Sequence, residues 1–585
     1  MTHTRQIMLV ICKILPYILG HPFEMAQLWL LGKLSVSFNS IFQAMRPIFF
    51  FVLLITFGSI HSQTFTRADT LRGSITPERA WWDVQFYALD VTVQPDKKYI
   101  EGSTTITYKV IDDKNRMQID LQAPMKIDKI VQNDTELRFT SEGAAHFVQL
   151  QQKQKEGKIY DITIHFSGNP LEAKNAPWDG GWSWKKDPNG NHFIATSNQG
   201  IGASVWWPNK DHAYDEPDRG ASVVITVPKG LVAVANGRKK AVAEDLDTDT
   251  YVWEVVNPIN NYGININIGD YVNFNESYKG LKGTLDMDYW VLRDNLKKAK
   301  GQFEQAPKMM RAFEHWFGPY PFYEDSFKLV EVPYLGMEHQ SSVTYGNKYA
   351  NGYLGRDLSG TGWGLKFDFI IIHEAGHEWF ANNITHVDVA DMWIHEGFTA
   401  YSESLYLDYH YGTEAASEYV IGTRRMIMND RPLIGVYNVH HEGSSDMYYK
   451  GANLLHTLRQ WIHDDAKWRN ILQGLNEEFY HQTVTSTQVE EFISDKSGLD
   501  LAAFWDQYLR TTKIPKLVYK KTGTTLNYRY EDIVNGFSMP VILQIDGKEE
   551  WIYPTGQWQT KTFSSAIDEV SVKPDFYVNS EEKND

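Results

Sequence analysis

The sequence predicts a multidomain α+β protein with an N-terminal antiparallel β domain, a mostly helical domain and a small C-terminal β-sandwich. Three observations predict this class. Hydrophobic and polar residues alternate through the first part of the chain, the period changes to that of a helix after about residue 292, and alternation returns from residue 516. With 42% hydrophobic residues in a chain of 585, there is enough apolar material for several cores.

The charge balance and the cysteine content exclude several classes of function. The chain has 57 basic and 73 acidic residues, a formal charge of -16, and no dense run of Lys or Arg. Nucleic acid and anionic membrane surfaces are therefore not expected as partners. Cys12 is the only cysteine, so an intramolecular disulfide is excluded and any metal must be bound by His, Asp or Glu.

The N-terminus has the layout of a secretory signal peptide. Residues 45–62 read "MRPIFFFVLLITFGSIHS", with a basic start, a short apolar run and small residues at the end. Met45 is then the expected start, and residues 1–44 are an upstream extension. We expect a secreted or periplasmic protein without stable membrane insertion after cleavage. The alternatives are an uncleaved N-terminal anchor and a second apolar anchor at residues 7–19.

Residues 63–285 are assigned to the N-terminal β domain. Leu89, Val91 and Val93 alternate with polar residues, and the same pattern continues through "SVVITVPKGLVAVANG" at 222–237. Alternation with turn residues between the runs is typical of antiparallel strands that are buried on one face.

Residues 286–515 are assigned to the mostly helical domain, and residues 516–585 to the small β domain. Helical spacing places Phe303, Met310, Phe313 and Trp316 on one face, and helical patterns dominate again from 367 to 509. Near the C-terminus, Asp546-Gly547 lies between "VILQI" and "WIYP", which predicts a hairpin turn. No internal repeat interrupts this order.

The stretch "IIHEAGHEWF" at 371–380 carries the strongest chemical signal. On a helix, His373 and His377 lie four residues apart and project from one face, and Glu374 lies beside them. That arrangement suits a metal ion with a general base next to it. The competing interpretation is a pair of core histidines without a metal.

A two-histidine zinc site usually needs a third protein ligand and an open position for water. Glu396 follows His377 with eighteen residues between them and lies in a run, 392–407, that has helical spacing. His395 is the rival ligand. Neighbours on a helix point about 100° apart, so only one of the two can face the metal, and position alone does not decide which.

These segments resemble a known family. "HEAGHEWFAN", the eighteen-residue spacing and "WIHEGFTAY" together resemble the gluzincin metallopeptidases of the aminopeptidase N family. The resemblance implies a thermolysin-like catalytic domain and one zinc ion per chain, bound by His373, His377 and Glu396. It also implies that Glu374 is the general base. The resemblance selects Glu396 over His395, because His395 stands where the family usually has Asn. Larger relatives carry a C-terminal helical domain; we expect none here, and hence a more open cleft.

A second segment, "YLGMEHQS" at 334–341, resembles the family's Gly-x-Met-Glu-Asn exopeptidase motif. Leu335 replaces the first Gly, Gly336 is the variable position, Met337 and Glu338 match, and His339 replaces Asn. By resemblance, Glu338 binds the free α-amine of a substrate, with Gly336 and Met337 beside it. A carboxylate in this place gains a charge-assisted hydrogen bond from an ammonium and none from an acylated terminus.

Three further residues are candidates for the same site. In "MYYKGANLL" at 447–455, Tyr448 matches the family tyrosine that donates a hydrogen bond to the oxyanion, and Tyr449 is its less suitable neighbour. Gln199, in "NQGIGASVWWPNKD", roughly matches a residue that holds the substrate's N-terminal end. Glu403, seven after Glu396, is either a partner of a metal-bound histidine or a surface acid.

The sequence therefore predicts a zinc aminopeptidase that acts on peptides with a free N-terminus. Two alternatives remain at this point. One is a zinc endopeptidase or an epoxide hydrolase of the same fold, because the exopeptidase motif is altered. The other is a non-catalytic zinc-containing protein that binds peptides, although such a protein has no need of a base beside its metal.

Overall fold

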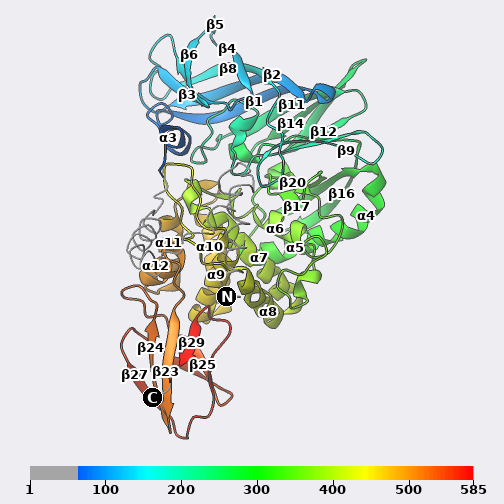
Figure 1. Ribbon diagram of the computed structural model, residues 1–585. Helices are drawn as coiled ribbons and strands as arrows, with labels where there is room; N and C mark the ends of the chain where they lie inside the picture. The colour runs from blue at the N-terminus through cyan, green and yellow to red at the C-terminus, as the bar shows by residue number, and fades with distance from the viewer. Residues whose placement is uncertain (1–63, 584–585) are drawn as a thin grey trace, which may run out of the picture. The chain divides into compact units, whose positions relative to one another are not determined.

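The computed structural model describes residues 64–583 (Figure 1). The predicted upstream extension and signal peptide lie outside the described residues. None of the helices in the described part of the chain is long and apolar enough to cross a membrane.

The first part of the described chain is the predicted β domain. It begins with helix α3 (Arg67–Gly73), and its main sheet has eight strands in the order β13-β14-β11-β1-β2-β8-β4-β5. All neighbours in this sheet are antiparallel except β1 and β11. The strands are β1 (Trp82–Gln94), β2 (Tyr99–Val110), β4 (Lys126–Gln132), β5 (Thr135–Glu136), β8 (Ile159–Gly168), β11 (Ala221–Pro228), β13 (Arg238–Glu244) and β14 (Thr248–Val255).

Two smaller sheets complete this domain, in the orders β3-β7-β6 and β12-β15-β10-β9. Their strands are β3 (Arg116–Asp120), β6 (Arg138–Glu142), β7 (Ala145–Gln149), β9 (Gly181–Lys186), β10 (His192–Ser197), β12 (Val232–Val234) and β15 (Asn267–Gly269). Leu89, Val91 and Val93 are buried in the domain core, as the alternation predicts, because one face of β1 packs inward.

The central domain combines a five-stranded sheet with most of the helices. The sheet order is β16-β17-β18-β20-β19, so β19 is an edge strand. The strands are β16 (Tyr271–Gly280), β17 (Gly283–Leu292), β18 (Phe327–Glu331), β19 (Gly336–Met337) and β20 (Val343–Tyr345). The boundary expected between residues 285 and 286 falls inside β17. An alternating hairpin does not reveal which sheet it joins, and here it pairs with β18 rather than with the β domain.

Helices of the central domain cover the sheet and continue well beyond it. They are α4 (Leu296–Gln302), α5 (Ala306–Phe317), α6 (Phe369–Gly376), α7 (Trp393–Tyr411), α8 (Thr413–Thr423), α9 (Tyr449–Ile462), α10 (Asp465–Glu478), α11 (Ser486–Ser497) and α12 (Ala502–Arg510). A short parallel pair, β21 (Ile384–His386) and β22 (Gln482–Val484), links the segment after α6 to the segment before α11. The predicted apolar face at Phe303, Met310, Phe313 and Trp316 is buried.

The last part of the chain forms two small sheets, in the orders β27-β24-β23-β29 and β26-β25-β28. Their strands are β23 (Lys516–Thr522), β24 (Thr525–Glu531), β25 (Val541–Ile545), β26 (Lys548–Ile552), β27 (Gln559–Thr562), β28 (Val570–Val572) and β29 (Asn579–Glu582). The predicted hairpin joins β25 to β26. Asp546 and Gly547 have φ values of 47° and 77°, the left-handed conformation that a two-residue turn of this kind requires.

Candidate active site

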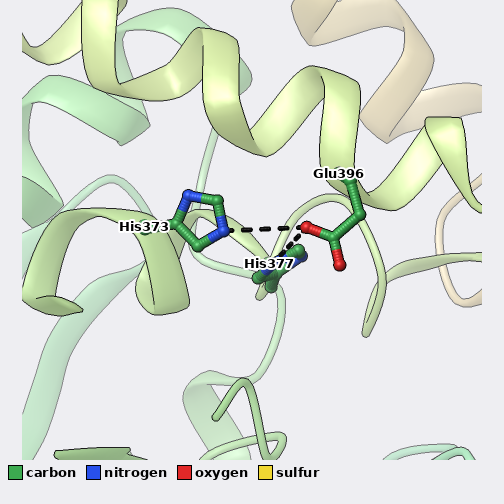
Figure 2. Close-up of side chains that lie close together, drawn as sticks. All are labelled: His373, His377 and Glu396. Atoms are coloured by element: carbon green, nitrogen blue, oxygen red, sulfur yellow. Dashed lines mark ion pairs between the residues drawn. The ribbon is translucent and has the colours of Figure 1, made fainter. Parts of the chain in front are cut away.

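Helices α6 and α7 bring three side chains together. Asp368 caps α6 by accepting hydrogen bonds from the backbone N–H groups of the first turn, and His373 lies on the face of α6 that meets α7. Oε2 of Glu396 lies 3.6 Å from Nε2 of His373 and 3.4 Å from Nε2 of His377 (Figure 2). All three side chains are buried, and one ligand atom of each lies within 4.8 Å of the other two.

This group of atoms fits a zinc ion. Four ligands at 2.0–2.1 Å in a tetrahedron lie about 3.3–3.4 Å from one another, close to the two distances seen here. Oε2 of Glu396 is buried and, within the described residues, has no hydrogen-bond partner, which is costly unless a cation binds there. Two nitrogens and one carboxylate oxygen leave the fourth position open, as in catalytic zinc sites.

The far nitrogens of both histidines are already engaged, which directs their Nε2 atoms toward Glu396. Nδ1 of His373 lies 2.7 Å from Oε1 of Glu403, and Nδ1 of His377 lies 3.1 Å from the carbonyl oxygen of Phe380. Such contacts fix the tautomer and the orientation of a metal-binding imidazole. Of the two interpretations of Glu403, the structure favours the partner of a histidine, because its side chain is 1% exposed.

His395 points away from this group. Its Nε2 accepts a hydrogen bond of 2.9 Å from the backbone N–H of His386, and the two imidazole rings stack with centroids 4.1 Å apart. Burial keeps the pKa of His395 well below its ordinary value. Between the two neighbours on α7, only Glu396 faces the histidine pair.

Glu374 lies next to β19. A Cβ atom on Gly336 would lie 3.1 Å from Oε1 of Glu374 and 2.6 Å from a methyl group of Ile370, so the absence of a side chain at Gly336 leaves room for this carboxylate. Burial raises the pKa of Glu374 to about 7, although the nearby His373 opposes the shift.

Glu338 follows β19 directly and receives two hydrogen bonds from the β domain. Nε2 of Gln199 donates to Oε1 of Glu338 at 2.7 Å and to Oε1 of Glu396 at 3.1 Å, and the Tyr262 hydroxyl donates to Glu338 at 3.2 Å. Burial raises the pKa of Glu338, while the nearby His377 and the hydrogen bond from Tyr262 favour its ionised form. Carboxylate oxygens of Glu338 and Glu374 and a nitrogen of His377 lie within 4.8 Å of one another.

Tyr262 is a residue that sequence reasoning missed. It lies in a short turn after β14, in "NNYG", and no motif marks it. Met337 is buried and pairs with Thr344 across β19 and β20, while His339 is buried with Nδ1 3.4 Å from the Thr344 hydroxyl. His339, which replaces the Asn of the family motif, therefore places a buried imidazole next to Thr344 of β20.

Tyr448 precedes helix α9, and its ring lies nearly parallel to that of His373, with centroids 5.9 Å apart. Burial and the nearby carboxylate of Glu396 raise the pKa of Tyr448 well above its ordinary value. The phenol is therefore protonated near neutral pH and able to donate a hydrogen bond.

These side chains line a pocket of about 700 Å³. Its lining includes every predicted site residue, namely Gln199, Gly336, Met337, Glu338, His373, Glu374, His377, Glu396 and Tyr448. Apolar side chains, among them Trp178, Leu335 and Phe369, form much of the remaining wall. None of the described residues that line it is Lys or Arg.

Two histidines and a glutamate on neighbouring helices, with a glutamate beside them, define a metallopeptidase of the gluzincin class. Residues 302–508 match the sequence profile of the Peptidase family M1 domain, and residues 84–262 match that of the Peptidase M1 N-terminal domain. The chain belongs to peptidase family M1, whose cofactor is Zn²⁺.

Curated relatives agree with this assignment. The chain is 20% identical to Probable aminopeptidase 1 of Sulfurisphaera tokodaii over 70% of its own length and 53% of that protein. It is 22% identical to Aminopeptidase N of Lactococcus lactis, over 75% and 52% of the two chains. It is 23% identical to Leukotriene A-4 hydrolase of Xenopus laevis, over 52% and 50%. The chain thus spans about half the length of these relatives.

A solved structure shows the same fold. A mutant M1 zinc metallopeptidase from Deinococcus radiodurans, bound to a Tyr-Ser-Ala substrate, superposes with a TM-score of 0.65 at 21% identity. The match covers 76% of this chain and 98% of that one. The β domain followed by a helical catalytic domain is therefore shared with a family member whose structure has been solved.

Proposed function

We propose that the protein is a zinc aminopeptidase that removes N-terminal residues from peptides with a free α-amine. His373, His377 and Glu396 would hold the zinc ion. When bound, zinc supplies Lewis-acid polarisation of the scissile carbonyl and lowers the pKa of a water molecule. The relatives named as aminopeptidases and the peptide-bound structural neighbour support peptides as the substrate class.

Glu374 takes the proton of the attacking water and later delivers it to the leaving amine. Its place beside Gly336, at the edge of the sheet, supports this role because a peptide bond held there lies next to the carboxylate. The Tyr448 hydroxyl donates a hydrogen bond to the carbonyl oxygen as negative charge develops on that oxygen.

The observation that carries the exopeptidase proposal is the position of Glu338. Its carboxylate lies within 4.8 Å of ligand atoms of both Glu374 and His377. In a peptide, the α-amine is only about 2.5 Å from the carbonyl carbon of the same residue, given standard backbone dimensions. An amine bound by Glu338 therefore presents the first peptide bond, rather than a later one, to the metal and the base.

Hydrolysis of one short peptide and of its N-acetylated twin tests this proposal. Zinc-loaded protein made from residue 63 onward is incubated with each peptide, and the products are identified by mass spectrometry. We expect stepwise loss of single residues from the free peptide only. Internal cleavage of both peptides would instead indicate an endopeptidase, and cleavage of neither would favour a zinc-containing peptide-binding protein.

We propose that the mature enzyme is secreted or periplasmic, on the basis of the signal-peptide pattern at residues 45–62. N-terminal sequencing of the protein recovered outside the cytoplasm tests this. Cleavage near residue 62 is expected, and an intact N-terminus held in a membrane fraction would contradict it.

A further inference from the structure

The edge strand β19 offers backbone groups to a substrate. In its sheet β19 pairs only with β20, in antiparallel orientation, so its other edge faces the catalytic pocket, which both of its residues line. A free strand edge binds extended peptides through main-chain hydrogen bonds. A peptide that lies along β19 is therefore held in an extended form.

Two carboxylates beside β19 determine the direction of such a peptide, given the proposed function on which this inference rests. The amine lies at Glu338, which follows the strand, and the bond to be cleaved lies at Glu374, which is beside Gly336. The peptide therefore runs opposite to the strand. Residues beyond the cleaved bond must pass Leu335 and continue toward Tyr334 and Pro333.

A second pocket, of about 590 Å³, lies along that path. Leu335 and Trp178 line both pockets, and Pro333 and Tyr334 line the second one. Trp178 is 63% exposed, an unusual state for an indole and one that suits a surface over which a chain passes.

The charges of the two pockets are opposite in kind. The catalytic pocket contains Glu338, Glu374 and Glu396 and no Lys or Arg among its described lining residues, whereas Lys298 and Lys348 line the second pocket. Lys348 has no hydrogen bond or ion pair within the described chain. Lys298 donates a hydrogen bond of 3.4 Å to Asn295, and its charge favours the ionised form of the nearby Glu331.

The second pocket holds one acid, Glu331, against two lysines, so its described lining keeps an excess of positive charge. Glu331 is 7% exposed, and its carboxylate accepts hydrogen bonds from the backbone N–H of Leu292 at 2.8 Å and from Asn295 at 2.7 Å. Lys348 and its neighbour Tyr349 have φ values of 57° and 59°, an unfavourable conformation for non-glycine residues that persists only where the surrounding structure holds it.

We propose that this second pocket, defined by Trp178, Leu335, Lys298 and Lys348 and called here the lysine pocket, binds the C-terminal carboxylate of short peptide substrates. The acidic catalytic pocket repels a carboxylate, and the lysine pocket attracts one. Peptides of the matching length are then held at both ends, by Glu338 at the amine and by the two lysines at the carboxylate.

The test compares peptides from dipeptide to hexapeptide, each as the free acid and as the C-terminal amide. At one length, kcat/KM of the acid should exceed that of the amide by about 5- to 20-fold, mainly through KM, because two exposed charge contacts are each worth a few-fold. The preference should shrink as salt is added.

The double variant Lys298→Gln/Lys348→Gln should abolish the preference for the acid while leaving the amides unchanged. Lys297→Gln is the matched control, since Lys297 is exposed on the same helix and does not line the pocket. The same acid-to-amide ratio in wild type and double variant at every length would overturn the lysine pocket. Failure of the wild type to cleave any of these peptides would instead overturn the proposed function.

Discussion

The two walls of the catalytic pocket are built in different ways. On the helical wall, His373, Glu374, His377 and Glu396 lie within one short segment of sequence, on α6, at its C-terminal end and on α7. On the β wall, Gln199 lines the pocket, and both Gln199 and Tyr262, which come from two loops of the β domain, donate hydrogen bonds to Glu338 across the domain boundary. The helical wall holds the proposed metal ligands and the proposed base, and the β wall orients Glu338, the residue proposed to bind the N-terminal amine of a substrate.

Long-range contacts hold the β wall in place. The carbonyl oxygen of Gly200, next to Gln199, accepts hydrogen bonds from Arg72 of α3 and from Nε2 of His440, each at 2.7 Å. Arg72 also donates to the carbonyl oxygen of Ile201. These donors lie far in sequence from the loop that carries Gln199. Substitutions in α3 that remove the Arg72 donor should therefore change substrate binding more than they change the chemical step.

The largest effect is expected on the helical wall. Glu374→Gln should lower kcat by about 10²–10⁴-fold, because the amide cannot accept the proton of the water. Zinc content, measured by elemental analysis, should stay near one per chain. A variant with more than half of the wild-type kcat would rule out Glu374 as the base.

Tyr448→Phe should lower kcat by about 10²-fold with little change in KM, since the lost hydrogen bond forms chiefly as charge develops on the oxygen. Tyr449→Phe is the matched control and should retain wild-type kinetics. Steady-state kinetics on one peptide give kcat and KM for both variants. Equal losses of kcat in the two variants would contradict the assignment of this role to Tyr448.

On the β wall, Gln199→Ala should raise KM for a free-amine peptide by about 10-fold and change kcat less, because the ionised form of Glu338 loses a donor. Arg72→Met should produce part of the same change. In the double variant the two effects should not add, since both act through one side chain.

Arg67→Met is the control for Arg72, because Arg67 lies on the same helix and pairs with Glu142 at the surface. It should leave KM unchanged. Additive effects of Gln199→Ala and Arg72→Met would show that Arg72 supports the fold in general rather than the position of Gln199.

The smallest effect on turnover is expected at Glu216, which does not line the catalytic pocket and accepts a hydrogen bond from Asn260 at 3.3 Å. Burial raises the pKa of Glu216 to about 7 from an ordinary 4.5. The stability that the neutral acid contributes is complete below pH 4.5 and is lost as the pH rises through 7.

Between pH 5 and pH 8 the wild type should therefore lose about 2 kcal/mol of unfolding free energy relative to Glu216→Gln, with kcat unchanged. Urea unfolding at the two pH values measures this difference. Parallel pH dependence in both proteins would show that the pKa of Glu216 is not raised.

Much of the fold could be predicted because hydrophobic periodicity reports local burial. The alternation at Leu89, Val91 and Val93, the helical face at Met310 and the hairpin at Asp546 all agree with the structure. The domain boundary was less predictable. Strand β17 alternates like its predecessors, and only its pairing with β18 assigns it to the central domain.

The sequence by itself predicted the histidine pair and the glutamate beside it, because a spacing of four residues on a helix sets the direction of His373 and His377 regardless of the rest of the fold. Only the tertiary structure decided between His395 and Glu396 on physical grounds, through the hydrogen bond from the His386 backbone N–H. It also brought Tyr262 to Glu338 and set a pocket with two lysines beyond Leu335. Such contacts join residues far apart in the chain, and no local pattern encodes them.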